Sequence, residues 1–159
     1  MRTVLDEAKS WFLETLAYTD KLRVVVVEGI RRDTPTDIQI GSHVIKGAYA
    51  LERSSESRRV AVHFPRTVAW QVVDESFTSA DTSEVRDDEG FLATLTRSAY
   101  LQYVEAHHGW FRDVVGPAAH YRLWTENEVI DVVAHDEPVV ESLVDTPPAD
   151  AADGTSSRS

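Results

Sequence analysis

Acidic side chains occur inside, or directly after, apolar segments that have the pattern of β-strands. Glu28 ends the valine-rich segment LRVVVVE, Glu75 follows the segment TVAWQVVD, and Asp131 lies within the run VIDVV. A carboxylate among the apolar residues of a strand must be ion-paired, hydrogen-bonded or exposed to water. If the three strands are neighbours, these carboxylates converge, and paired acids whose pKa values are pushed apart can act as general acid and base. The alternative is that each carboxylate points to solvent or pairs with an arginine.

Histidine and tyrosine side chains add further candidates for acid–base chemistry. His63 lies within the strand-like segment AVHF and could act as a general base. It could equally be a buried histidine that is hydrogen-bonded to the backbone, because any buried imidazole needs such a partner. His120 and Tyr121 begin a later segment, HYRLW, which precedes the segment that contains Asp131.

These residues define a candidate ligand pocket of acidic, imidazole and phenol side chains: Glu75, His120, Tyr121 and Asp131, with Glu28 or His63 as additions. If they face one apolar cavity of about 300 Å³ or more, the cavity is the expected binding site. The protein would then be a small-molecule-binding protein or a hydrolase-like enzyme.

Several well-defined catalytic and cofactor motifs are absent from the sequence. The seven glycines form neither GxGxxG nor GxxxxGK[ST], and there is no HExxH zinc motif. There is no GxSxG nucleophile elbow. The absence of cysteine excludes disulfides, cysteine-based zinc sites and cysteine nucleophiles. We therefore predict no metal site and no cofactor, and we can assign no catalytic residue.

Trp110 and Phe111 lie in a segment, EAHHGWFRDVVGP, that has no regular apolar period. Large apolar side chains in such a segment are either tucked under a loop or presented to a ligand. Because aromatic residues contribute much of the binding energy of protein interfaces, these two are the candidate protein-interface residues.

The composition is that of an acidic, soluble domain. The 159 residues carry 16 Lys+Arg against 27 Asp+Glu, a formal net charge of −11. This charge favours a basic protein partner and disfavours nucleic acid, whose binding requires a basic face. The N-terminus contains acids and no long apolar core, which is not the pattern of a signal peptide. No run of about 18 apolar residues is present, so we predict no membrane partner and a cytoplasmic location.

Residues 3–17 have the spacing of an amphipathic helix. Apolar residues recur there at the 3.6-residue period: Leu5, Ala8, Phe12 and Leu16. Thr3 and Asp6 resemble a capping box at its start. We expect this helix to pack on one face of a sheet.

Short β-branched and aromatic segments fill most of the remaining chain, and connections of hairpin length join them. Ser98 can cap a short helix over residues 99–107. We therefore predict the α+β class: a curved antiparallel sheet, the N-terminal helix on one face, and one short helix before the last hairpin. Residues 1–144 form the single domain, and residues 145–159, which contain no large apolar side chain, form a disordered tail.

Several short motifs in residues 70–140 resemble an uncharacterised family of small bacterial cytoplasmic proteins. They are VDESF at residues 73–77, SAYLQY at residues 98–103, His120-Tyr121, and VIDVV at residues 129–133. The family tends to have Asn where this chain has Asp74. The resemblance implies no activity, but it adds weight to the polar positions that match: Glu75, Ser98, His120, Tyr121 and Asp131.

The main functional hypothesis is a non-enzymatic module that binds or inhibits another protein. An acidic, cysteine-free single domain without a catalytic signature resembles the small acidic immunity proteins that neutralise bacterial toxins. Acidic surfaces steer basic partners towards them and raise association rates. The alternative remains the carboxylate and histidine pocket described above.

Overall fold

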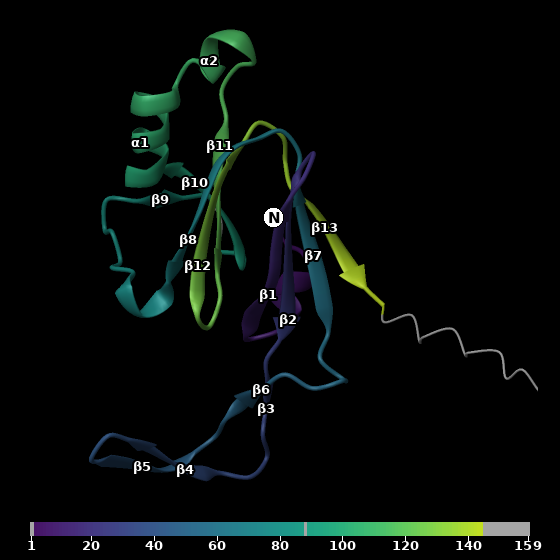
Figure 1. Cartoon of the computed structure of the whole chain (residues 1–159), viewed down its shortest axis with the longest axis vertical. Helices are drawn as coiled ribbons and strands as arrows, with labels where there is room; N and C mark the ends of the chain where they lie inside the picture. The colour runs from purple at the N-terminus through teal and green to yellow at the C-terminus, as the bar shows by residue number, and fades with distance from the viewer. Residues whose placement is uncertain (1, 88, 145–159) are drawn as a thin grey trace, which may run out of the picture.

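The computed structural model describes residues 2–87 and 89–144 of the chain. Strands make up 49% of it and helical residues 15%. Two antiparallel sheets face each other, and a narrow two-stranded extension projects from one end of them (Figure 1). The architecture is a β-sandwich with an arm, so the predicted α+β class, with a helix packed on one face of a single sheet, is wrong.

The first sheet contains four strands, in the order β1 (Trp11–Tyr18), β2 (Leu22–Glu28), β7 (Arg59–Phe64) and β13 (Val139–Leu143). The second sheet contains five, in the order β8 (Thr67–Asp74), β12 (Glu128–Ala134), β11 (Ala119–Trp124), β10 (Leu92–Arg97) and β9 (Val85–Arg86). Every neighbouring pair is antiparallel. The predicted hairpin-type connections are therefore present, but they build two sheets instead of one.

Alternate side chains of the two sheets meet in one hydrophobic core. Val24 and Val26 of β2 and Ile130 and Val132 of β12 belong to it, and all four are 0% exposed. Full burial of such a side chain stabilises the fold by about 1.5–3 kcal/mol. The valine-rich segment thus forms a strand that ends at Glu28, as predicted, and the strand lies in the interior of the first sheet.

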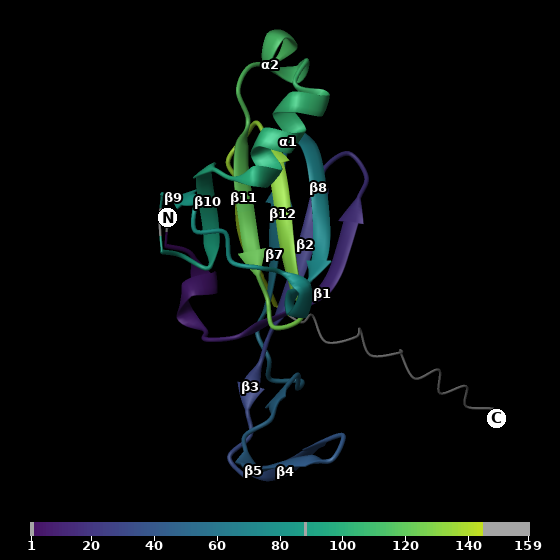
Figure 2. The same cartoon turned by 90° about the vertical axis from the view of Figure 1, so that its left-hand side faces the viewer.

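The outer face of the second sheet is partly covered by the helix α1 (Ala99–His108), as Figure 2 shows. Val104 of this helix is 1% exposed. The Ser98 hydroxyl accepts a hydrogen bond from the Leu101 amide at 3.0 Å and so caps the helix. The predicted helix over residues 99–107 is confirmed and is one residue longer. A single further turn, α2 (Phe111–Val114), follows it.

The predicted N-terminal helix over residues 3–17 is wrong. Its capping box exists, because Asp6 accepts from the Thr3 amide at 2.6 Å, but it caps only the one-turn 3-10 helix η1 (Val4–Glu7). The chain then enters β1. Leu13 and Leu16 both pack against the core, although they are three residues apart, because a bulge lies between Leu13 and Thr15. An extra residue in a bulge shifts the two-residue period of a strand, which here imitates a helical spacing.

Residues 30–52 form the extension, which we call the arm. The short pair β3 (Ile30–Arg31) and β6 (Leu51–Glu52) forms its root, and the hairpin of β4 (Thr36–Ile40) and β5 (His43–Ala48) forms its end (Figure 1). Gly41 has a φ of 60° in the two-residue turn of this hairpin. A positive φ at the first turn position is typical of type II′ hairpins, which favour glycine there.

Gly29 connects the arm to the sandwich. A Cβ atom at this position would lie 2.8 Å from Cε2 of Phe12, closer than real Cβ contacts. The Gly29 amide also donates to the Ser10 carbonyl at 3.0 Å. The absence of a side chain therefore lets the chain leave β2 close beside the start of β1.

No helix in the described part of the chain is long and apolar enough to cross a membrane. The predicted tail, residues 145–159, lies outside the described residues.

Candidate functional site

The structure divides the four residues of the predicted pocket among three places. His120 and Asp131 lie on the outer face of the second sheet, under α1, and are 0% and 2% exposed. Tyr121 points to the opposite face, because side chains alternate along β11. Glu75 lies in the one-turn helix η2 (Glu75–Phe77), which follows β8. The four side chains therefore do not line one cavity.

His120 and Asp131 are the centre of a buried polar network. His120 Nε2 lies 2.8 Å from Asp131 Oδ1, and His120 Nδ1 lies 2.6 Å from the Ser98 hydroxyl. A neutral His120 with its proton on Nε2 satisfies both contacts, since Nε2–H donates to the carboxylate and Nδ1 accepts from the hydroxyl. The network thereby joins β11, β12 and the first residue before α1.

Asp131 accepts two further hydrogen bonds. Arg122 Nε donates to its Oδ1 at 2.6 Å, and Gln71 Nε2 donates to its Oδ2 at 2.9 Å. Burial by itself would raise the pKa of Asp131, but the hydrogen bonds from His120, Arg122 and Gln71 lower it to about 2. The carboxylate is therefore ionised at neutral pH despite its burial.

Arg122 extends the network to the loop that precedes β9. Its two terminal nitrogens donate to the Glu84 carboxylate at 2.6 and 3.1 Å. This two-pronged contact matches the planar geometry of guanidinium and carboxylate groups. The guanidinium thus balances both Glu84 and Asp131.

The order hydroxyl, imidazole, carboxylate is that of a Ser-His-Asp triad, in which histidine activates a serine nucleophile. Here the Ser98 hydroxyl is occupied by the N-terminus of α1, since it accepts the Leu101 amide hydrogen. Ser98 is also 1% exposed, so a substrate carbonyl has no access to it. The arrangement fixes α1 to the second sheet through hydrogen bonds that are all satisfied.

Two of the additional candidates have other partners. Glu28 receives hydrogen bonds from Arg58 at 2.8 and 3.1 Å, which lower the pKa of Glu28 against the opposing effect of burial. His63 Nε2 lies 3.2 Å from the Glu141 carboxylate, across the β7–β13 pair. Neither side chain reaches the network on the second sheet, because both belong to the first sheet.

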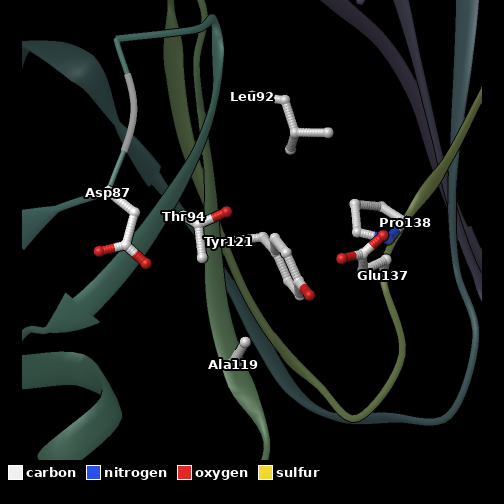
Figure 3. A pocket seen from close by; sticks show the side chains of 7 residues that line it. All are labelled: Asp87, Leu92, Thr94, Ala119, Tyr121, Glu137 and Pro138. Carbon is white, nitrogen blue, oxygen red and sulfur yellow. The ribbon is translucent and has the colours of Figure 1, made fainter. Parts of the chain in front are cut away.

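Tyr121 faces a cavity of about 380 Å³ at the open edge of the sandwich (Figure 3). The cavity lies between the inner face of β10 and β11 and the turn that precedes β13. Apolar and polar side chains line it: Asp87, Leu92, Thr94, Ala119, Tyr121, Glu137 and Pro138. Burial, followed by the negative charges of Glu137 and Asp136, raises the pKa of Tyr121.

The predicted interface residues belong to the start of α2, with Trp110 as its N-cap and Phe111 as its first residue, and α2 lies at the end of the molecule opposite the arm (Figure 1). Trp110 is 78% exposed. Phe111 is half-buried, and its ring meets the His135 ring edge-on at a centroid distance of 5.4 Å. Trp110 is thus presented to solvent, whereas Phe111 supports the turn of α2.

The arm presents a second exposed apolar surface, which sequence reasoning did not identify. Ile38 and Ile45 are cross-strand partners, and Ile40 shares their face because it lies two residues from Ile38. Their exposed fractions are 40%, 50% and 60% for Ile38, Ile45 and Ile40. We call these three residues the isoleucine face.

Sequence reasoning also missed how Arg122 and Asp131 pair, although a signal was present. If Glu126 and Asn127 form the two-residue turn of the last hairpin, counting outwards places Arg122 opposite Asp131, as the structure does. An arginine opposite an aspartate in a hairpin is a cross-strand ion pair. The hydrogen bonds that involve Gln71 and Glu84 could not be predicted in this way, because these two residues lie in segments that are distant in the sequence.

Among the described residues, no group of three or more histidine, aspartate or glutamate side chains has the arrangement of a metal site. Comparison with known proteins adds no relative to this picture, so the resemblance of residues 70–140 to a bacterial family stays a prediction. The chain matches no protein-family model, no curated protein and no solved structure to a significant degree.

Proposed function

We propose that the protein is a non-enzymatic module that binds a basic protein partner through its arm, in the manner of an immunity-like inhibitor. The observation that carries this proposal is the exposed isoleucine face of the arm, and the arm itself projects from the sandwich (Figure 1). The proposal includes a cytoplasmic location, with which the absence of cysteine is compatible.

The physics of a two-stranded ribbon supports a binding role for the arm. An isolated hairpin is only marginally stable in water, because it has no second layer on which to bury its apolar face. Side chains such as Ile38 and Ile45 would gain about 25 cal/mol for each Å² of apolar surface that a partner removes from water. A rim of polar residues around an exposed apolar patch is typical of interaction sites.

Charge supports a basic partner. The arm has equal numbers of basic residues (Arg31, Arg32 and Lys46) and acidic residues (Asp33, Asp37 and Glu52), so the net charge of −11 belongs to the rest of the chain. An acidic body attracts a basic protein over long range and accelerates association. A nearly neutral arm can then enter an apolar cleft without carrying unpaired charge into it.

The hydrolase-like alternative has less support from the geometry. Its histidine and aspartate belong to a buried network whose hydroxyl, Ser98, already caps a helix. Nucleophilic catalysis needs a hydroxyl that substrate can reach. The network therefore favours a positioning role over a catalytic one.

A pair of matched substitutions tests the proposal. Ile45→Thr removes apolar surface from the isoleucine face, and Val44→Thr makes a similar change at the neighbouring residue, whose side chain lies on the other face. Both retain a β-branched side chain, so the tendency to form the strand is kept. The partner is first captured with the wild-type protein and purified, and it is then titrated against each variant. We expect Ile45→Thr to raise the dissociation constant about tenfold, which corresponds to a loss of about 1.4 kcal/mol of binding free energy.

Equal effects of the two substitutions would contradict the proposed face. A loss of binding in Trp110→Ala, with Ile45→Thr unchanged, would place the interface at α2 instead. Light scattering supplies a further test: a dimer of the wild-type chain that Ile45→Thr converts to a monomer would show that a second copy, and not a basic protein, covers the arm.

A further inference from the structure

The cavity at the open edge of the sandwich contains the hydroxyl of Tyr121, a largely buried residue whose polar atom has no protein partner in the described part of the chain. Tyr121 is 6% exposed, and its ring packs against Phe64 at a centroid distance of 5.9 Å. Figure 3 shows the Tyr121 side chain among the residues that line the cavity, with its hydroxyl turned towards Glu137. The hydroxyl has no hydrogen bond to any described residue. The hydroxyl is therefore accessible from the cavity and can form a hydrogen bond with water or with a ligand.

Two carboxylates at the rim of the cavity also lack a cation. Neither Glu137 nor Asp87 forms an ion pair within the described part of the chain. Asp136, directly before Glu137, differs in this respect, because Arg66 donates to it from Nε at 2.7 Å and from a terminal nitrogen. In this turn, the charge of Asp136 is therefore neutralised by Arg66, whereas Glu137, which faces the cavity, has no cationic partner in the described part of the chain.

The remaining lining is suited to a short carbon chain. Leu92 and Ala119 contribute apolar side chains from β10 and β11, and Pro138 contributes its ring from the opposite side. The volume of about 380 Å³ is within the range of small-molecule sites, at its lower end. Anionic ligands are disfavoured here, because two carboxylates would repel them.

We propose that this cavity binds a small aliphatic amine, whose ammonium group lies between the Glu137 carboxylate and the Tyr121 hydroxyl and whose carbon chain covers Leu92. An ammonium group has three donors, which match a carboxylate and a hydroxyl oxygen. Asp87 adds a second negative charge at the other side of the opening. The site is separate from the arm, so this inference is independent of the proposed protein-binding function.

Titration with butylamine and with 1-butanol tests the charge requirement. The two probes have chains of equal length, and only the amine is cationic at neutral pH. In ¹H–¹⁵N correlation spectra of the full chain, we expect butylamine to shift the amide signals of Thr94, Tyr121 and Glu137 in a saturable manner, with a dissociation constant at least tenfold below that of 1-butanol. Equal affinity for the two probes would overturn the proposal, because the cavity would then recognise only apolar surface.

Variants test the named groups. Glu137→Gln should weaken the binding of butylamine about tenfold and leave the affinity for 1-butanol unchanged. Tyr121→Phe should weaken the binding of butylamine by less, since only one hydrogen bond is lost. Glu126→Gln is the matched control, because it removes the same charge from an exposed turn outside the cavity. If Glu137→Gln binds butylamine as Glu126→Gln does, the proposal is wrong.

Two further measurements separate this inference from its alternatives. Calcium chloride that produces the same spectral shifts at lower concentration than butylamine would show a metal site and overturn the amine assignment. Ile45→Thr, which tests the arm, should leave butylamine binding unchanged. A failure of one proposal can therefore be distinguished from a failure of the other.

Discussion

At the scale of single residues, the buried network shows how a carboxylate is stabilised inside a sheet. The desolvation cost of burying Asp131 is offset by hydrogen bonds from three side chains on two strands: His120 and Arg122 on β11, and Gln71 on β8. Such a group is stable only while every partner is present, since a buried charge that loses a partner keeps the full cost of desolvation.

The pKa of Asp131 predicts how stability depends on pH. It is about 2 in the folded protein, below the ordinary value of 3.8. The unfolded chain therefore binds more protons between these values, and the stabilisation is fully present above about pH 4 and is lost as the pH falls towards 2. We expect the free energy of unfolding from urea titrations to contain a term of about 2 kcal/mol that disappears over this window.

Asp131→Asn should lower the free energy of unfolding at pH 7 by about 3 kcal/mol, because an amide cannot replace the ionised partner of Arg122. It should also remove the part of the free energy of unfolding that depends on pH between about 4 and 2. Asp136→Asn is the control, since its pair with Arg66 is exposed and should contribute much less. An Asp131→Asn protein with the wild-type dependence on pH would refute the assignment.

A second prediction concerns Ser98. Ser98→Ala removes both the cap of α1 and the partner of His120 Nδ1, so we expect the free energy of unfolding to fall by about 1–3 kcal/mol. Ser142→Ala, at an exposed position of β13, should have little effect. Thermal unfolding followed by circular dichroism measures both. Because the hydroxyl caps a helix, a fluorophosphonate probe should leave Ser98 unmodified, and labelling of Ser98 would support the hydrolase-like alternative instead.

At the scale of secondary-structure elements, the sequence predicts strongly patterned segments well. The valine-rich β2, the capped helix α1 and the last hairpin are all evident from local signals. Strand β1 is not, because its bulge converts strand alternation into a spacing close to 3.6 residues. The separation of the strands into two facing sheets also escaped prediction, since hairpin connections are equally compatible with one sheet or two.

The site was only partly predictable for a related reason. The sequence predicted His120, Tyr121 and Asp131 in one pocket, but adjacent residues of a strand face opposite sides, so Tyr121 had to separate from His120. Which face is covered by a helix and which by the other sheet depends on long-range packing, which a local pattern does not contain.

The arm should open independently of the sandwich. Native-state hydrogen exchange is expected to show lower protection for the amides of β4 and β5 than for Val24 or Val132, because the arm contributes no residue to the buried core. Gly41→Ala places a side chain at a φ of 60°, which costs roughly 1 kcal/mol, and should accelerate exchange in the arm alone. A fall in protection of Val132 in this variant would show that arm and sandwich unfold together.

At the scale of the whole molecule, three surfaces with different chemistry are separated in space. The arm and α2, which Trp110 directly precedes, lie at opposite ends of the molecule (Figure 1), and the cavity lies against β10 and β11 of the sandwich (Figure 3). The first sheet already closes without the arm, because the Glu28 amide donates to the Arg58 carbonyl at 2.8 Å and β2 continues to pair with β7. The arm is thus an addition to a hairpin that is complete beneath it.

This geometry predicts that the arm can be removed. Ile30 and Glu52 are cross-strand partners, so an Asn-Gly turn can replace residues 31–51 and close the hairpin. We expect the shortened protein to keep its strand-rich circular dichroism spectrum and a melting temperature within about 5 °C, because a loss of about 1 kcal/mol shifts a domain of this size by a few degrees. It should lose its protein partner and still bind butylamine. Collapse of the fold would show that the arm is part of the stable core, and retention of the partner would move the binding surface to the sandwich.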